Sequence, residues 1–192
     1  MKIVRIFADQ LFAFQYEGEV DNEYDRIMEL WTDISFLRAY AKENNIINVK
    51  KFVNTILQDA EQIQDFLENI NQNKEPYGFY FEPLQNSERN KILAFQKGKI
   101  KENILRYYAI KLDDNCFVIT GGAIKMSQTM QEHPDTDNEL KKLEKARAFL
   151  KENGASSIKE EDLSVEKRDM FGDLIVKSPA AEYDFAVKKA GD

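Results

Sequence analysis

Alternating apolar and polar positions mark the first segments of the chain. Residues 2–8 and 11–17 both alternate in this way, with Asp9 and Gln10 between them. Alternation with a period of two is typical of a β-strand that buries one face. We therefore expect a hairpin, or one long bent strand, that packs on the helices after it.

Two longer segments, 21–44 and 48–71, repeat their apolar residues every three or four positions, which predicts two amphipathic helices. Asp21 or Asn22 is placed to cap the first helix, and Asn48 the second. We interpret both apolar stripes, including Trp31, as core positions rather than binding sites.

Short β-rich segments follow the helices. Residues 77–81 predict a short strand or an extended edge that reaches Pro83, and 92–95 predict a further short strand. Residues 104–112 and 116–124 predict a longer pair. The connection Asp113-Asp114-Asn115 is short and polar, so the longer pair is expected to form an antiparallel hairpin. Gly121-Gly122 interrupts its second strand and favours a bulge or bend there.

A third helix is expected from Thr136 or Asp137 to about Gly154, where a glycine favours termination. The pattern weakens after it. The predicted fold is α+β, with an antiparallel sheet packed against a two-helix hairpin and a further C-terminal helix. We expect one domain over residues 1–154 and a partly ordered appendage over 155–192.

Composition restricts the chemistry. No apolar run approaches the roughly 18 residues of a membrane helix, and no signal peptide is recognisable at the start. Cys116 is the only cysteine and His133 the only histidine, so an internal disulfide and sites built on several histidines are excluded. We expect a cytoplasmic protein without a cofactor, whose catalysis, if any, depends on Lys, Arg, Tyr, Asp or Glu.

The charge is unevenly distributed. The whole chain carries −7, but residues 87–131 hold eight basic and four acidic side chains, a local charge of +4. Basic and aromatic side chains interleaved on a sheet suit RNA, because cations bind phosphates and rings stack on bases. The candidates are Lys99, Lys101, Arg106, Tyr107, Tyr108, Lys111 and Lys125. A simple solvated basic face is the alternative interpretation.

The order of these segments resembles the RelE/HigB branch of the RelE/ParE toxin superfamily over residues 81–152. The motifs are Phe81-Glu82-Pro83-Leu84, Leu105-Arg106-Tyr107-Tyr108, the final strand and turn over 118–129, and a closing helix over 140–147. The resemblance implies a toxin that degrades mRNA, usually at the ribosome, and that a small antitoxin protein neutralises.

Carried over by position, the resemblance implies Arg106, Lys125 and Tyr108 as catalytic residues. Charge assigns Lys99, Lys101 and Lys111 to RNA binding, and no metal is needed, because the RNA 2′-hydroxyl can itself attack phosphorus. The chain is longer and more acidic than the family pattern, and Met126 stands where a second lysine is expected. The alternative hypothesis is therefore a non-catalytic protein-interaction module on the same fold.

Overall fold

The computed structural model describes residues 1–6, 10–71, 77–85, 87, 93–98, 100, 102–113, 115–126 and 134–153, together with three short strands in the tail. The helices are α1 (Glu23–Thr32), α2 (Ile34–Glu43), α3 (Val49–Glu68) and α4 (Pro134–Glu152). The strands of the main sheet are β1 (Lys2–Arg5), β2 (Leu11–Gln15), β3 (Glu82–Pro83), β4 (Phe95–Gly98), β5 (Leu105–Asp113) and β6 (Cys116–Ile124).

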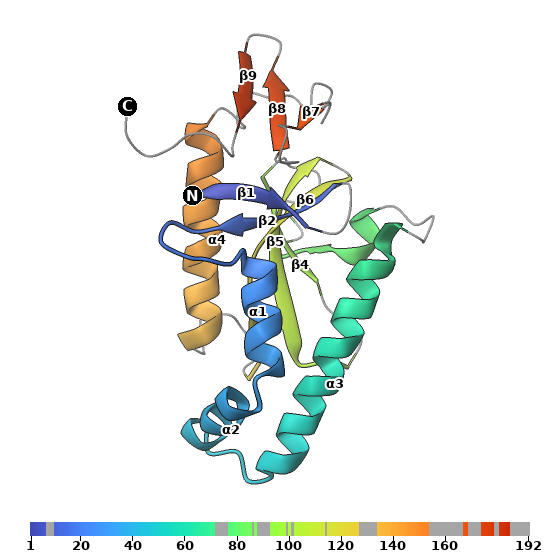
Figure 1. Ribbon diagram of the computed structural model, residues 1–192, viewed down its shortest axis with the longest axis vertical. Helices are drawn as coiled ribbons and strands as arrows, with labels where there is room; N and C mark the ends of the chain where they lie inside the picture. Colours follow the sequence, from blue (N-terminus) through green and yellow to red (C-terminus); the bar gives the residue numbers. More distant parts are fainter. Residues whose placement is uncertain are drawn as a thin grey trace.

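These strands form one six-stranded sheet in the order β1-β2-β6-β5-β4-β3 (Figure 1). The β5–β6 hairpin is antiparallel and central, as its β-rich sequence predicts. The N-terminal hairpin is also confirmed, since β1 pairs antiparallel with β2. The β2–β6 pair is parallel, so the sheet is mixed and mostly antiparallel rather than purely antiparallel.

The first predicted helix is two helices, because Asp33 ends α1 and caps α2. Its carboxylate Oδ1 accepts hydrogen bonds from the backbone N–H groups of Ser35 (2.7 Å) and Phe36 (3.2 Å). Such a cap satisfies amides at a helix start that would otherwise lack partners. The helical part between β2 and β3 is therefore α1, α2 and α3, and not a two-helix hairpin.

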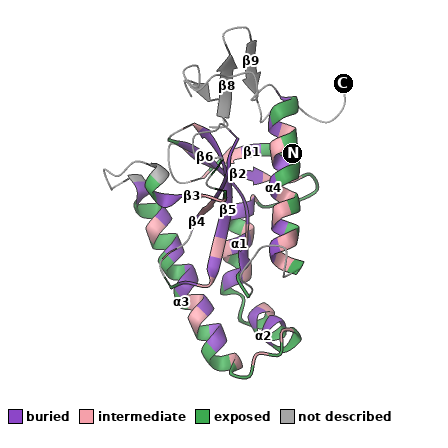
Figure 2. Ribbon diagram, turned by 180° about the vertical axis from the view of Figure 1, so that it is seen from behind, coloured by how far each residue is buried: buried purple, intermediate pink, exposed green. Residues whose placement is uncertain are grey.

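Helices cover both faces of the sheet. On one face, α1–α3 pack on residues such as Tyr107, Ala109 and Ile119. On the other, Leu143, Ala146 and Leu150 of α4 pack on the opposite side chains of the same strands. Buried residues accordingly follow the sheet-facing side of α4, while its outer side is exposed (Figure 2). The sheet is the central layer of three.

Two of the predicted short strands are corrected. Residues 77–81 include a 3₁₀ helix (Tyr77–Tyr80) instead of a strand, because Tyr80 turns its ring onto Phe66 of α3, with 4.6 Å between ring centroids. The strand expected over 92–95 begins only at Phe95. Leu93 has a left-handed φ of 58°, which an extended strand does not allow.

The predicted bulge in the second hairpin strand is present. The register passes from Tyr108–Gly121 to Ala109–Ile119, so Thr120 is an extra residue in β6. The bulge reverses which residues face each side. Phe117 and Ile119 face α1–α3 before it, whereas Gly121 faces α4 after it.

The last helix starts earlier than predicted, at Pro134. A proline has no backbone N–H to donate, but the N–H groups in the first turn of a helix have no partner within the helix, so proline is tolerated there. In the tail, strands β7 (Lys167–Arg168), β8 (Leu174–Ser178) and β9 (Ala181–Asp184) form a separate three-stranded antiparallel sheet. The rest of the predicted appendage, and the expected end of the helix at Gly154, lie outside the described residues.

Gly98→Ala is expected to lower the free energy of unfolding by about 2–3 kcal/mol. An added Cβ would overlap the ring of Tyr107, which is fully buried and whose hydroxyl donates to the Tyr80 carbonyl at 2.8 Å. Urea unfolding of the variant measures the loss. In a Tyr107→Leu background the same glycine substitution should have little further effect, and an equal loss in both backgrounds would contradict this explanation.

Candidate functional site

The described residues singled out from the sequence do not all lie on one face of the sheet. Tyr108 and Lys111 are buried, with exposed fractions of 2% and 7%. Side chains alternate along β5, so Tyr108 faces α4 while Lys111 belongs to the opposite face of the sheet. Lys125 is exposed just after β6, and Lys99 and Lys101 lie outside the described residues.

Arg106 is half-buried at the start of β5. Its Nη1 donates hydrogen bonds to the backbone carbonyls of Asn103 and Leu105, both at 2.5 Å. Desolvation lowers the pKa of Arg106, and the nearby Tyr108, Asp59 and Glu82 act in the opposite direction. The Lys125 N–H donates to the Ile104 carbonyl at 2.8 Å, so Lys125 and Arg106 lie at the same end of the hairpin.

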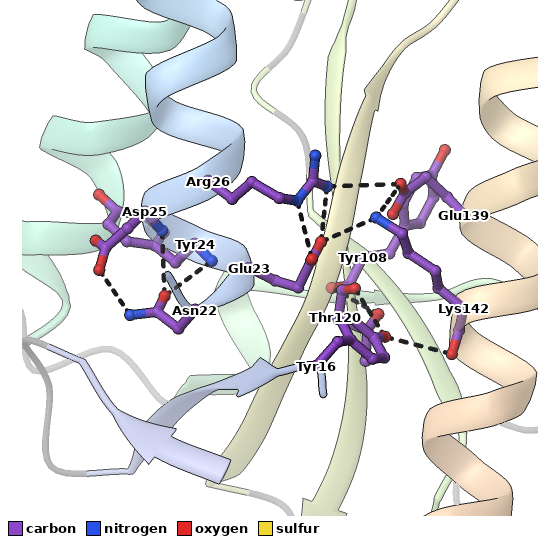
Figure 3. A network of polar contacts seen from close by, with 10 residues as sticks. All are labelled: Tyr16, Asn22, Glu23, Tyr24, Asp25, Arg26, Tyr108, Thr120, Glu139 and Lys142. Atoms are coloured by element: carbon purple, nitrogen blue, oxygen red, sulfur yellow. Dashed lines mark hydrogen bonds and ion pairs between the residues drawn. The ribbon is translucent and has the colours of Figure 1, made fainter. Parts of the chain in front are cut away.

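A different group of charges lies between α1 and α4 (Figure 3). Glu23 and Glu139 are buried, with exposed fractions of 2% and 6%, and Arg26 and Lys142 are half-buried beside them. Arg26 binds Glu23 in a bidentate arrangement at 2.9 and 2.7 Å, and lies 3.8 Å from Glu139 Oε1. Lys142 Nζ contacts both carboxylates, at 3.1 Å from Glu23 and 3.0 Å from Glu139.

Local sequence explains how each helix presents its pair. The side chain of Asn22 accepts hydrogen bonds from the Tyr24 and Asp25 amides at 3.0 and 3.1 Å, so α1 begins at Glu23. Glu23 and Arg26 are then three residues apart and share one side of the helix. Glu139 and Lys142 have the same spacing on α4. The two helices therefore face each other with one acid and one base each.

The bulge in β6 makes room beneath these carboxylates. A Cβ on Gly121 would overlap Glu139 Oε2 and would lie 3.1 Å from Glu23 Oε2. Tyr16 closes the network, since its hydroxyl lies 3.1 Å from the Thr120 carbonyl and 3.4 Å from that of Lys142. Burial raises the pKa of Tyr16 well above its usual range, so the hydroxyl stays protonated and acts as a donor.

Glu139 is the titratable group most suited to proton transfer here. Desolvation raises the pKa of Glu139 to about 7, although Lys142 and Arg26 favour its charged form. Its Oε2 accepts no hydrogen bond from the described residues. Burial raises the pKa of Tyr108 to about 12, and the nearby Glu139 carboxylate acts in the same direction. Glu139 can therefore exchange a proton near neutral pH.

A cleft of about 580 Å³ opens beside this network, between α1–α2 and the first half of α4, with the end of β6 as its floor. Arg26, Glu139 and Lys142 line one part of it. Its other wall is aromatic, with Trp31, Phe36 and Tyr40. The volume lies within the usual range for small-molecule sites.

The cleft thus offers a proton acceptor and two cations, which are the groups that acid–base chemistry on an anionic substrate requires. Within the described ranges, no cluster of three or more His, Cys, Asp or Glu side chains could hold a metal ion. Among the same residues, no helix is long and apolar enough to cross a membrane.

Sequence reasoning missed this site because its helices are more than a hundred residues apart in the chain. One signal was available: Glu23-x-x-Arg26 and Glu139-x-x-Lys142 repeat the same acid–base spacing on two helices. That signal is weak, because exposed helices commonly carry such pairs. Only the fold reveals that both carboxylates are buried.

No family model, curated protein or solved structure matches this chain. The resemblance to RelE/HigB toxins therefore stays a prediction that rests on the motifs.

Proposed function

We propose that the protein is a toxin-like ribonuclease that cleaves RNA without a metal ion, in the cleft between α1–α2 and α4. The observation that carries this proposal is Glu139, whose pKa is raised to about 7, in the wall of a cleft that it shares with Arg26 and Lys142. The sequence motifs over residues 81–152 support the toxin assignment, and a small antitoxin protein is the expected partner.

The cleavage step follows from these groups. The Glu139 carboxylate takes the proton of an RNA 2′-hydroxyl, and the 2′-oxygen forms a bond to the adjacent phosphorus. Arg26 stabilises the charge that develops on the phosphoryl oxygens. The bond from phosphorus to the 5′-oxygen breaks, and the Lys142 ammonium donates a proton to that oxygen. The products are a 2′,3′-cyclic phosphate and a 5′-hydroxyl.

The residues first assigned from the sequence take supporting parts in this proposal. Lys125 is exposed next to Ile124, which lines the cleft, so it binds a phosphate of the RNA outside the cleft. Tyr108 lies close enough to Glu139 that the carboxylate disfavours ionisation of the phenol, so Tyr108 stays protonated beside it. Arg106 orders the backbone at the start of β5 through its two carbonyl contacts. Buried Lys111 has no direct part.

Growth of a bacterium that expresses the chain tests the proposal. Induction of the wild type should arrest growth, and Glu139→Gln should relieve the arrest, because a glutamine amide cannot take the 2′-hydroxyl proton. Glu144→Gln is the matched control, since Glu144 is exposed on the same helix and should leave the arrest unchanged. Normal growth under strong expression of the soluble wild type would contradict the proposal.

The second candidate is a non-catalytic protein-interaction module. The observation that favours it is the mutual pairing of Glu23, Arg26 and Lys142, which also suits a purely structural tie between α1 and α4. In that case a partner protein, rather than RNA, would bind the surface. A purified chain that captures a specific protein but neither binds nor cleaves RNA would favour this module.

A further inference from the structure

The two ends of the cleft differ in charge along α4. The ligand inferred below from this difference rests on the proposed ribonuclease function. Arg26 and Lys142 give one end two cations, with Glu139 between them. Asp135, one helical turn before Glu139, lies about 6 Å away along the helix axis and lines the other end. A ligand that fills the whole cleft must therefore carry an anion at one end and hydrogen-bond donors at the other.

The end of the cleft that contains Asp135 is also aromatic. Phe36 is half-buried and lines the cleft, so part of its ring is accessible there. Tyr40 stacks on Phe52, with 6.0 Å between ring centroids and 5° between ring planes, and Trp31 packs tightly on Gly122. These two rings are fixed from behind. Phe36 is left as the ring on which a flat ligand can stack.

Two acidic residues, Asp135 and Glu43, line the same cleft as this ring. Asp135 interacts with the hydroxyl of Tyr40, and a carboxylate has further lone pairs with which to accept from a ligand. Glu43 is exposed at the rim of the same end of the cleft. Two acidic groups repel a phosphate at this end and favour a base that presents N–H groups.

We infer that the cleft binds one unpaired guanine nucleotide of an RNA strand. The base stacks on Phe36 and directs its N–H groups to Asp135, and the 3′-phosphate lies on Arg26 and Lys142. Asp135 favours guanine over the other bases, because the N1–H and N2–H₂ groups of guanine lie side by side and can donate to the two oxygens of one carboxylate. Single-stranded RNA is commonly recognised by this combination of stacking and edge-on hydrogen bonds.

Trp31 is the only tryptophan in the chain and lines the cleft, so its fluorescence reports occupancy directly. Titration of the full chain with guanosine 3′-monophosphate should give a saturable change, with uridine 3′-monophosphate binding at least tenfold more weakly. Phe36→Leu should weaken guanosine 3′-monophosphate binding about tenfold, the size of one lost stacking contact. Asp135→Asn should remove the preference for guanine.

Phe79→Leu is the matched control, because Phe79 is an exposed ring outside the cleft, and this variant should bind as the wild type does. The comparison of the two nucleotides uses the wild-type chain alone, so the inference remains testable even if a variant unfolds. Equal affinity for both nucleotides, or no saturable change with either, would overturn it.

The outcome also separates this inference from the proposed function. Glu139→Gln should still bind guanosine 3′-monophosphate, because Glu139 acts on the 2′-hydroxyl and not on the base. Nucleotide binding by a wild type that leaves RNA intact would support the inference and overturn the ribonuclease. Cleavage of RNA with no preference for guanine would support the ribonuclease and overturn the inference.

Discussion

Replacement of Glu139 by glutamine is expected to lower the rate of RNA cleavage by about 10²–10⁴-fold, the usual contribution of a general base. Glutamine keeps the size of the side chain but cannot take a proton. The wild-type rate should also rise with pH up to about 7 and then level off, because only the ionised carboxylate is active and the pKa of Glu139 is about 7. Initial rates on a purified RNA, measured from pH 5 to pH 9, give both results.

Glu144→Gln provides the control for this experiment, as it removes an exposed carboxylate from the same helix. Its rate and pH profile should match those of the wild type. An active Glu139→Gln protein with an unchanged pH profile would exclude Glu139 as the base and leave it as a structural residue.

The second large effect concerns stability. The wild-type protein is expected to lose free energy of unfolding as the pH rises from 5 to 8, by about 2–3 kcal/mol from Glu139 alone. Burial raises the pKa of Glu139 in the folded state to about 7, above its ordinary value of 4.5. Between these values the folded protein keeps a proton that the unfolded chain has released. The stabilisation is therefore complete below pH 4.5 and is lost as the pH rises through 7.

Urea unfolding at several pH values measures this effect, and Glu139→Gln isolates it. Glutamine does not titrate, so the variant should gain stability relative to the wild type as the pH rises from 5 to 8. Other groups titrate equally in both proteins and cancel in the difference. A difference between the two proteins that does not change with pH would show that Glu139 has an ordinary pKa in the folded state.

Local patterns predicted the elements that depend on neighbouring residues. The β5–β6 hairpin and its bulge were predictable because β-rich runs, a polar turn and Gly121-Gly122 are adjacent in sequence. The break at Asp33 was missed, since the apolar stripe continues across it and only the cap interrupts the helix. The strand expected at 77–81 failed because tertiary packing on Phe66 overrides the β-propensity of an aromatic segment.

The candidate site was less predictable, for two physical reasons. Arg106 and Lys111 are five residues apart on β5, so alternation sends their side chains to opposite faces, which sequence reasoning could have noticed. The burial of Glu23 and Glu139 depends on α1 meeting α4 above Gly121, a contact between distant parts of the chain. No local pattern distinguishes these two glutamates from exposed ones.

The chemical nature of the cut RNA ends tests the proposed cleavage step most directly. The purified chain should cleave single-stranded RNA in the presence of a metal chelator, and mass spectrometry should find 2′,3′-cyclic phosphate and 5′-hydroxyl ends. The same oligonucleotide with 2′-deoxyribose at the cleaved position should remain intact there, because the attacking 2′-oxygen is missing. Cleavage at the 2′-deoxy position, or no cleavage of RNA by the folded wild type, would contradict the proposed cleavage step.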